Sequence, residues 1–414
     1  MFVLALASAP AAAQVCGEAV TGAPLGTALG GVSCGGDASG GGSSAFGNST
    51  ASGNGSVAIG NGSTASGTAG VASGVLSNAS GHSAIAIGGI TQATADNSTA
   101  VGVTSQATGV AASAFGANST AGGVYSTAIG GGASGATAAS STGNYSLAMG
   151  GGDGVGGVGA VSTGNKSIAI GISSAAAGVS SMAIGSGATA GTANAVALGN
   201  AATASGTNSF SAGNSSSAIG ASGIAIGDGA TAGSGANAVA IGTGASAGFA
   251  NSTAIGSGAT ATAANQVAIG TATNTYRMAG VASAASLAAQ SGSVSFVTTD
   301  AAGNLATSGF NPASITSLQS QVTSLQSQVM DNRLEARSGT AVALAAGSMP
   351  ALQQGRKFAL SAGYGNFEGA NAFAVGATAL LYDGKSYAVV ANAGGGIGLE
   401  RNVAGGRGAV SIQW

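Results

Sequence analysis

Few side chains in this 414-residue sequence could carry out acid–base, redox or metal chemistry. It contains one histidine, His82, and two cysteines, Cys16 and Cys34, which are too few for a multi-histidine metal site or a zinc ribbon. Residues 1–276 have a single basic side chain, Lys166, and five acidic ones. General acid–base catalysis would lack its usual groups there. We therefore expect no catalytic residue, no metal site and no enzyme activity.

One glycine-rich motif matches the pattern of a nucleotide-binding loop. Residues 154–159 (GVGGVG) fit the dinucleotide pattern G-x-G-x-x-G. A chain with 78 glycines produces such a match by chance, and no strand-to-helix pattern surrounds it. The net charge of −2 likewise offers no positive surface to nucleic acid. The sequence thus predicts neither a cofactor nor a nucleic-acid partner.

The strongest pattern in the sequence is an internal repeat. A short apolar motif that ends in glycine recurs, as in residues 56–60 (SVAIG), 126–130 (STAIG) and 237–242 (NAVAIG). Most of the closing glycines are fourteen residues apart. They are Gly60, Gly74, Gly88, Gly102, Gly116, Gly130, Gly150, Gly171, Gly185, Gly199, Gly213, Gly227, Gly242, Gly256 and Gly270.

A repeat of this length suits two short strands and two turns, which is one coil of a β-solenoid. In the first motif, Val57 and Ile59 share one face of the strand and Ala58 lies on the other. We expect valine, isoleucine and alanine to fill a thin core, and glycine to allow the positive φ of a tight corner. No proline occurs between Leu25 and Asn311, as a continuous ladder requires. Burial must then come from stacking many coils and from packing several chains together.

Two consecutive steps of the repeat are longer than the rest. They contain Tyr145, Asp153 and Lys166. Insertions in a solenoid map to loops on one face. The insertions at 131–170 are then either a binding loop or a neutral bulge, and the sequence leaves both interpretations open.

After Gly270 the repeat stops, and residues 317–330 contain two nearly identical heptads, SLQSQVT and SLQSQVM. Their apolar residues, alternately three and four apart, are typical of a coiled-coil seam. The seam is short, so its stability depends on flanking structure. Its predicted core residues are Ile315, Leu318, Val322, Leu325 and Val329.

Residues 358–414 are typical of four strands of an outer-membrane barrel. Each strand alternates larger apolar residues with small or polar ones, and aromatic residues lie near the strand ends. Asp383-Gly384 predicts a tight hairpin turn. The residues predicted to face lipid are Phe358, Leu360, Tyr364, Phe373, Val375, Tyr387, Val389, Val410, Ile412 and Trp414.

Four strands cannot close a barrel, so several copies of the chain must complete it. Valine at a and leucine at d favour a two-stranded coiled coil. Two copies would give eight strands, however, and side chains fill the interior of an eight-stranded barrel. Three copies give twelve strands and a lumen. We therefore predict a homotrimer whose barrel is surrounded by outer-membrane lipid.

The N-terminal residues are typical of the end of a secretory signal peptide. An apolar start is followed by the small residues Ala11, Ala12 and Ala13. In an exported chain we expect one disulfide, between Cys16 and Cys34, which would close the segment before the first repeat.

Taken together, these motifs resemble the trimeric autotransporter adhesins, the YadA-like family, over nearly the whole length of the chain. The repeats of residues 44–270 are similar to the head repeats of that family, and residues 276–282 (YRMAGVA) to its neck. Residues 296–305 resemble a connector between neck and stalk. Residues 331–334 (DNRL), the four strands and the terminal Trp414 are similar to its membrane anchor.

The resemblance implies a mainly β fold in three parts. These are a trimeric left-handed parallel β-roll head, a short coiled-coil stalk, and a twelve-stranded transmembrane β-barrel anchor formed by three chains. It further implies that the barrel-insertion machinery recognises the terminal aromatic residue. The corresponding division is a signal-peptide remnant (1–13), an N-terminal segment (14–43), a head of 14-residue repeats (44–270), a neck and connector (271–313), a stalk (314–337) and the anchor (338–414).

The function implied is that of a cell-surface adhesin that exports itself by type V secretion. Its anchor would lie in the cell outer membrane, and its exposed head would bind host matrix, host cells or other bacteria. The alternative is a non-adhesive surface-coat or ice-binding β-solenoid rod on the same membrane anchor. A flat array of threonine on one face would favour ice binding, and the sequence shows no regular ladder of this kind.

Overall fold

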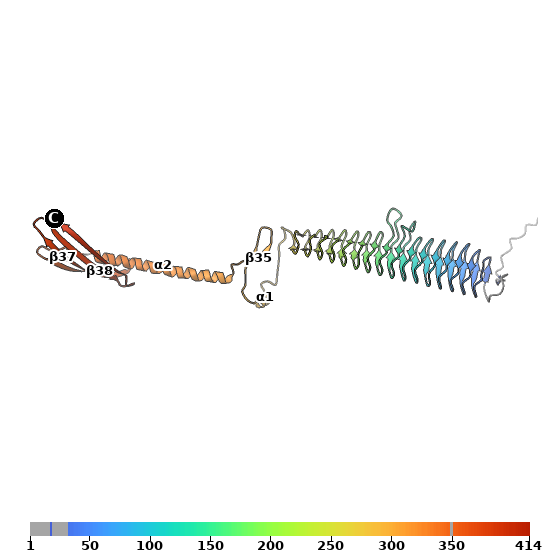
Figure 1. The fold of residues 1–414 in the computed structure, drawn as a ribbon, viewed down its shortest axis with the longest axis horizontal. Coiled ribbons are helices and arrows are strands. Elements are labelled where there is room, and N and C mark those ends of the chain that lie inside the picture. The colour runs from blue at the N-terminus through green and yellow to red at the C-terminus, as the bar shows by residue number, and fades with distance from the viewer. Residues whose placement is uncertain (1–16, 19–31, 348–350) are drawn as a thin grey trace, which may run out of the picture. The chain divides into compact units, whose positions relative to one another are not determined.

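A computed structural model describes residues 17–18, 32–347 and 351–414 of the chain. These residues belong to two compact units, residues 1–276 and residues 277–414. The first unit is a parallel β-solenoid, and the second combines two helices, a hairpin and a four-stranded sheet (Figure 1). The predicted order of a mainly β head, a helical stalk and four C-terminal strands is confirmed, but the helix is longer than the short stalk predicted at 314–337.

Each regular coil of the solenoid contributes one three-residue strand to a first sheet, sheet A, and one two-residue strand to a second, sheet B (Figure 1). Strands of successive coils pair in parallel, and in most coils each residue lies beside the residue fourteen positions later. Ala58 therefore lies beside Ala72, and Thr64 beside Asn78. Identical positions of the repeat thus form columns along the solenoid.

The described part of sheet A has 18 strands and sheet B has 15. The strands of sheet A are β1 (Gly17–Glu18), β2 (Val32–Cys34), β3 (Ser44–Phe46), β5 (Val57–Ile59), β7 (Val71–Ser73), β9 (Ile85–Ile87), β11 (Thr99–Val101), β13 (Ser113–Phe115), β15 (Thr127–Ile129), β17 (Leu147–Met149), β19 (Ile168–Ile170), β21 (Met182–Ile184), β23 (Val196–Leu198), β25 (Phe210–Ala212), β27 (Ile224–Ile226), β29 (Val239–Ile241), β31 (Thr253–Ile255) and β33 (Val267–Ile269). Those of sheet B are β4 (Thr50–Ala51), β6 (Thr64–Ala65), β8 (Asn78–Ala79), β10 (Gln92–Ala93), β12 (Gln106–Ala107), β14 (Thr120–Ala121), β16 (Ser140–Ser141), β18 (Val161–Ser162), β20 (Ala175–Ala176), β22 (Thr189–Ala190), β24 (Thr203–Ala204), β26 (Ser217–Ala218), β28 (Thr231–Ala232), β30 (Ser246–Ala247) and β32 (Thr260–Ala261).

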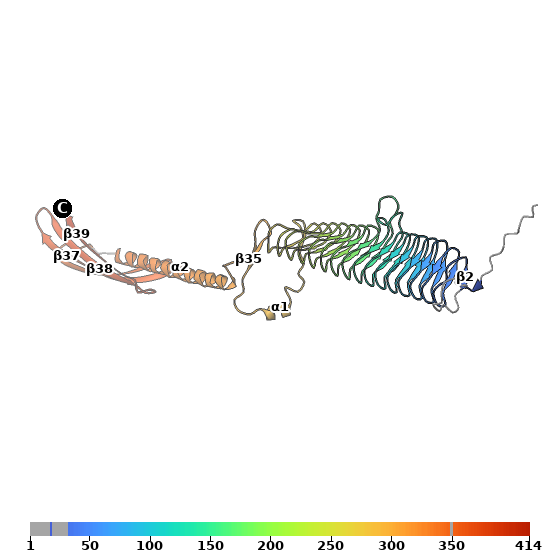
Figure 2. The ribbon, with the colours of Figure 1, turned by 45° about the vertical axis from the view of Figure 1, so that its right-hand side comes forward.

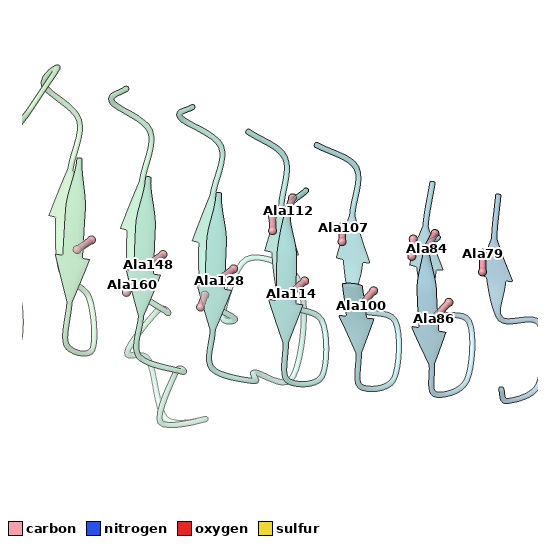
Figure 3. Close-up of a cluster of buried hydrophobic side chains, with 14 of the residues drawn as sticks. Ala79, Ala84, Ala86, Ala100, Ala107, Ala112, Ala114, Ala128, Ala148 and Ala160 are labelled. Carbon is pink, nitrogen blue, oxygen red and sulfur yellow. The ribbon is translucent and has the colours of Figure 1, made fainter. Parts of the chain in front are cut away.

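The interior of the solenoid is built from alanine and serine. Ala58 and Ala72 are fully buried, whereas Ile59, the next residue along, is 42% exposed on the outside of sheet A. Figure 3 shows such buried alanines in successive coils. Inward serines reach the backbone, as where Ser63 Oγ donates to Gly60 O at 3.0 Å. The expectation of a core of valine, isoleucine and alanine is therefore wrong for the branched apolar residues, because an interior this thin is filled by methyl and hydroxymethyl groups, with Thr91 the one larger side chain among the described residues that is fully buried.

Each coil turns at positions with left-handed backbone. At Gly199, φ is +129°, and a Cβ atom there would lie 2.5 Å from Gly213 O, which confirms the predicted glycine corner. A second left-handed position, which we name the corner column, lies two residues before each sheet A strand and is often asparagine. There Asn237, Asn251 and Asn265 form successive Nδ2 to Oδ1 hydrogen bonds of 3.0 and 3.1 Å. Asparagine suits this column because it tolerates left-handed backbone better than most residues.

The second unit starts with short elements and continues into one long helix. The short elements are α1 (Ala284–Ala289) and an antiparallel hairpin of β34 (Val297–Thr299) and β35 (Leu305–Thr307). The long helix is α2 (Pro312–Gly347), which contains both heptads and continues beyond residue 337. Its start is set by Asn311, whose Oδ1 accepts the Ser314 N–H at 3.1 Å, and by a proline at the first helical position.

No helix in the described part of the chain is long and apolar enough to cross a lipid bilayer.

The C-terminal strands form one antiparallel sheet in chain order, as predicted. They are β36 (Phe358–Phe367), β37 (Ala370–Asp383), β38 (Ala388–Gly398) and β39 (Ala404–Gln413). A bulge near the end of β37 shifts the register between Leu380 and Tyr382, so that Tyr382 pairs with Val389. Leu381 therefore has no pairing partner in β38, and the two-residue alternation of β37 shifts beyond it.

The end of α2 packs against one face of this sheet (Figure 2). Ala341 and Ala345 of the helix are buried there against the small residues Ala372 and Ala374 of β37. At Gly365 of β36 the two backbones come so close that a Cβ atom would lie 2.3 Å from Ala341 O. The small residues of the strands are thus the ones that face the helix.

Candidate functional site

The outer face of sheet A carries a column of large apolar side chains, which we name the sheet A stripe. Because alanine and serine already complete the interior of each coil, the stripe has no role in the core of the single chain. Ser73 and Ala212 interrupt the column, but an exposed apolar surface of this extent marks an interaction site. Its members, 37% to 50% exposed, include Ile59, Ile87, Phe115, Ile129, Met149, Ile226, Ile241, Ile255 and Ile269.

The predicted coiled-coil residues form a second exposed apolar row, along α2. Positions three and four apart lie on the same side of a helix, so these five residues share one face. All of them lie in the part of α2 that precedes the contact with the sheet. The residues and their exposed fractions are Ile315 (45%), Leu318 (55%), Val322 (47%), Leu325 (58%) and Val329 (57%). Their role as a coiled-coil core stays a prediction.

The C-terminal sheet has two chemically different faces. The small face lies against α2, and the opposite face presents the residues predicted to contact lipid. Of these, Val389 is half-buried and the rest are exposed by 46% or more. The exposed ones are Phe358, Leu360, Tyr364, Phe373, Val375, Tyr387, Val410, Ile412 and Trp414. Contact of this face with lipid stays a prediction.

Two ion pairs connect α2 to the turns of the sheet. Arg337 Nε lies 2.8 Å from the Glu368 carboxylate in the β36–β37 turn, and Arg401 in the β38–β39 loop binds Asp331. Next to the second pair, the Glu400 carboxylate accepts hydrogen bonds from the backbone N–H and the side-chain amide of Asn371. These hydrogen bonds hold the pKa of Glu400 below its ordinary value. These contacts attach the helix to one end of the sheet.

The two insertions of the head stack on each other. They connect β15 to β16 and β17 to β18, and Figure 2 shows a loop in the green part of the ribbon that projects beyond the other turns. Gly152 N donates to Thr137 O of the other insertion at 2.8 Å. The Asp153 carboxylate accepts the N–H groups of Val155 and Gly157 at 2.9 and 2.8 Å, and these bonds hold its pKa below the ordinary value. The insertions therefore form one ordered projection, with Val155 90% exposed.

Tyr145 and Lys166 do not lie in these insertions, contrary to the grouping made from the sequence. Both belong to the corner column, at the other turn of their coils. The residue of the preceding coil in that column is Tyr125, and its ring stacks on that of Tyr145 with centroids 5.3 Å apart and planes 13° apart. This pair was not predicted from the sequence. Aligning the repeats would have revealed it, because both tyrosines directly precede the serine that begins the apolar motif.

The remaining candidate residues form turns. His82 Nδ1 lies 3.1 Å from Ser83 Oγ, but Asp96 accepts the backbone N–H of His82 and not its ring N–H, so the three residues do not form a catalytic triad. Within the described ranges, no group of three or more His, Cys, Asp or Glu side chains could hold a metal ion. Cys34 ends β2, whereas Cys16 lies outside the described residues, and the disulfide between them stays a prediction.

Comparison with known proteins identifies the repeats. The sequence pattern described as "YadA head domain repeat" matches ten segments of the chain, some of which overlap. They are residues 38–63, 51–77, 79–105, 107–133, 162–188, 176–202, 193–216, 218–245, 234–259 and 250–273. The matches leave out residues 134–161, where most of the insertion pair lies.

Among solved structures, the collagen-binding domain of the Yersinia adhesin YadA is similar, at 21% sequence identity. The match covers 50% of this chain and 74% of that one, with a TM-score of 0.19. No curated protein matches the chain. With head repeats over most of its solenoid, followed by a long helix and four C-terminal strands, the chain belongs to the YadA-like family of trimeric autotransporter adhesins.

Proposed function

We propose that this chain is a self-exporting surface adhesin that works as a homotrimer. The family is not one of enzymes, and its members are homotrimers that bind host matrix. The observation that carries the proposal is the two-faced C-terminal sheet, which packs its small residues on α2 and presents large apolar residues outward. A sheet with this pattern is suited to a membrane on one side and a helix-filled lumen on the other.

Trimer formation is supported by the unpaired sheet edges and the exposed apolar rows of the single chain. Strands β36 and β39 are the edges of a four-stranded sheet, and an open edge cannot persist inside a membrane. Three copies would close twelve strands around three α2 helices. The same three copies would cover the coiled-coil row of α2 and the sheet A stripe. We keep the division into head (44–270), neck and connector (271–313), stalk (314–337) and anchor (338–414) as part of this proposal.

The proposed location is the outer membrane, with lipid around the anchor and the head exposed at the cell surface. The proposed partners include the barrel-insertion machinery, for which an exposed aromatic residue such as Trp414 is available. The head would bind host matrix, host cells or other bacteria. The Yersinia domain to which the chain is similar is described as collagen-binding.

The outer face of sheet B argues against the ice-binding alternative. Its outward column begins with Thr50 and Thr64 but continues with Asn78, Gln92 and Gln106. A surface that orders water by a regular array of hydroxyl and methyl groups would not be interrupted in this way.

A display experiment tests the adhesive function. Bacterial cells would present either the full chain or residues 271–414 behind a signal peptide, and adhesion to matrix-coated surfaces and to cultured cells would be measured. We expect both proteins to reach the surface and only the full chain to cause adhesion. Equal adhesion by the two kinds of cell would refute the adhesive role of the head.

A further inference from the structure

Three consecutive positions of the corner column have unusual residues. Tyr125, Tyr145 and Lys166 have φ values of +53°, +58° and +59°. Left-handed backbone is unfavourable for large side chains, and most of this column is glycine, alanine, serine or asparagine. Strained residues persist where the surrounding structure fixes them, and they gather at ligand-binding sites. Large residues also occupy the left-handed position before the sheet B strands, as at Leu76 and Ile90. What distinguishes Tyr125, Tyr145 and Lys166 is therefore their chemistry, two phenol rings and one ammonium group in three adjacent coils.

The two tyrosines form a rigid exposed surface. Each is more than half exposed, Tyr125 by 56% and Tyr145 by 60%, although their rings stack. An exposed tyrosine presents an apolar ring and a hydroxyl group, and it loses little conformational entropy on binding. Stacking reduces that entropy further, because each ring already restricts the other.

Polar groups beside the rings are held in fixed orientations. Asn144 Oδ1 accepts the Val124 N–H at 3.0 Å, and Asn165 Oδ1 accepts the Asn144 N–H at 3.0 Å. Both asparagines are exposed, so their amide N–H groups face solvent from a defined position. Asn144 directly precedes Tyr145, and Asn165 directly precedes the lysine of the column.

Lys166 adds the one positive charge. It is the only basic side chain in residues 1–276, it is exposed, and it makes no ion pair with any described residue. Successive coils are about 4.8 Å apart, so the three column residues extend over about 10 Å. The only lysine of the head thus lies one coil beyond its only pair of stacked rings.

We propose that Tyr125, Tyr145 and Lys166 form a contact site for an acidic saccharide chain. This inference rests on the adhesive function proposed above and assigns it one ligand class. Sugar rings present C–H groups to aromatic rings, and their hydroxyl groups pair with phenol and amide groups. The lysine selects a carboxylate on the neighbouring sugar. Tyrosine is also enriched at protein–protein interfaces, so an acidic protein is the competing partner that the polyglutamate arm of the test below detects.

The test uses the full chain, extracted in detergent as its assembled form, and three variants. Tyr125→Asn/Tyr145→Asn and Lys166→Asn introduce the residue that this column uses elsewhere, so the fold is kept. Ser222→Ala, also in the column at φ +55°, is the matched control. Binding to short polygalacturonate fragments would be measured beside dextran fragments, which are neutral, and polyglutamate peptides.

We expect the wild type and Ser222→Ala to bind polygalacturonate and to lose affinity as salt is added. The double tyrosine variant should bind at least tenfold more weakly. Lys166→Asn should lose the preference for polygalacturonate over dextran.

Several results would overturn the assignment. They are absence of polygalacturonate binding in the wild type, equal binding by all variants, and polyglutamate binding as tight as that of polygalacturonate. Disassembly of the double tyrosine variant would show that the rings contact another copy of the chain. Cells that display and adhere through a wild-type chain unable to bind polygalacturonate would refute only this site, whereas failure of display or adhesion would refute the proposed function itself.

Discussion

The head and the C-terminal sheet both bury their smallest side chains and expose large apolar ones, but they complete their interiors differently. In the head, Ala58 and the alanines above and below it fill a space between two strands of the same coil. In the C-terminal sheet, Ala372 and Gly365 face the backbone of a separate helix, α2. The head is thus a series of small units that each close within one chain, whereas the C-terminal sheet has two open edges.

This difference predicts how each region responds to damage. A solenoid coil contacts only its neighbours, so a defect in the head stays local. The small residues of β36, β37 and β38 pack on one helix, so a defect there affects that whole packing surface. In both regions we propose that partner copies or lipid cover the exposed apolar residues.

The largest effect is expected from Gly365→Val in β36. Its added atoms would meet Ala341 O and Ala345 N at distances that real Cβ atoms do not show, so the helix must shift. Overpacking of this kind costs about 3 kcal/mol per chain, and an assembly of three chains would suffer it three times. We expect the heat-resistant oligomer to disappear on a denaturing gel. Gly408→Ala is the control, because a Cβ there meets nothing closer than 3.9 Å, and it should leave the band unchanged.

A smaller and more local effect is expected from Gly199→Val in the head. Valine cannot easily adopt the left-handed backbone of that corner, so the variant should lose about 2 kcal/mol. Hydrogen exchange should rise in the coils next to residue 199 and stay unchanged in residues 358–414. Ser222→Ala, at a position where other coils already have Ala69 and Ala111, should change stability by less than about 0.5 kcal/mol. Equal melting of the two variants would refute the role assigned to the glycine corner.

The effect of Leu325→Ser should differ between a single chain and an assembly of several copies. In one chain Leu325 is 58% exposed, and its replacement should have almost no effect. If copies of α2 bury it, the loss is about 2 kcal/mol per chain. We expect the temperature at which the oligomer dissociates to fall for Leu325→Ser and to stay constant for Gln321→Ser, which lies outside the apolar row. A constant temperature for both would mean that no coiled coil forms.

The smallest effect is expected from protonation of Asp153. Its folded-state pKa is below the ordinary value of 3.8, so its contribution to loop order is present above that value and is lost as pH falls through the folded pKa. The NMR amide shifts of Val155 and Gly157 should therefore stay constant from pH 7 to about 4 and move only below that. A transition centred above pH 4 would contradict the hydrogen bonds assigned to this carboxylate.

Sequence periodicity predicted the coils and the four strands because both depend on local alternation. It did not predict which face of the coil is inside. The alternation of Val57, Ala58 and Ile59 is the same whether branched residues point inward or outward, and the usual preference for burying them gave the wrong answer. Only the width of the coil, which is a property of two sheets together, decides in favour of alanine.

The tyrosine pair of the candidate site was also not predictable from local periodicity. An insertion lies between Tyr125 and Tyr145, so their spacing is twenty residues and not fourteen, which conceals that they occupy the same column. Likewise, the bulge beside Leu381 changes the facing of residues that a strict two-residue period would place. The exposed rows along α2 and the outer face of the C-terminal sheet were predictable, because heptads and strand alternation are again local patterns.

The most direct test of the account is native mass spectrometry of the full chain released from its outer membrane in detergent. We predict a complex of three copies that remains intact until the detergent is removed or the sample is denatured. A folded, water-soluble single copy, stable without detergent, would contradict the central claim that partner copies and lipid cover the apolar faces of this chain.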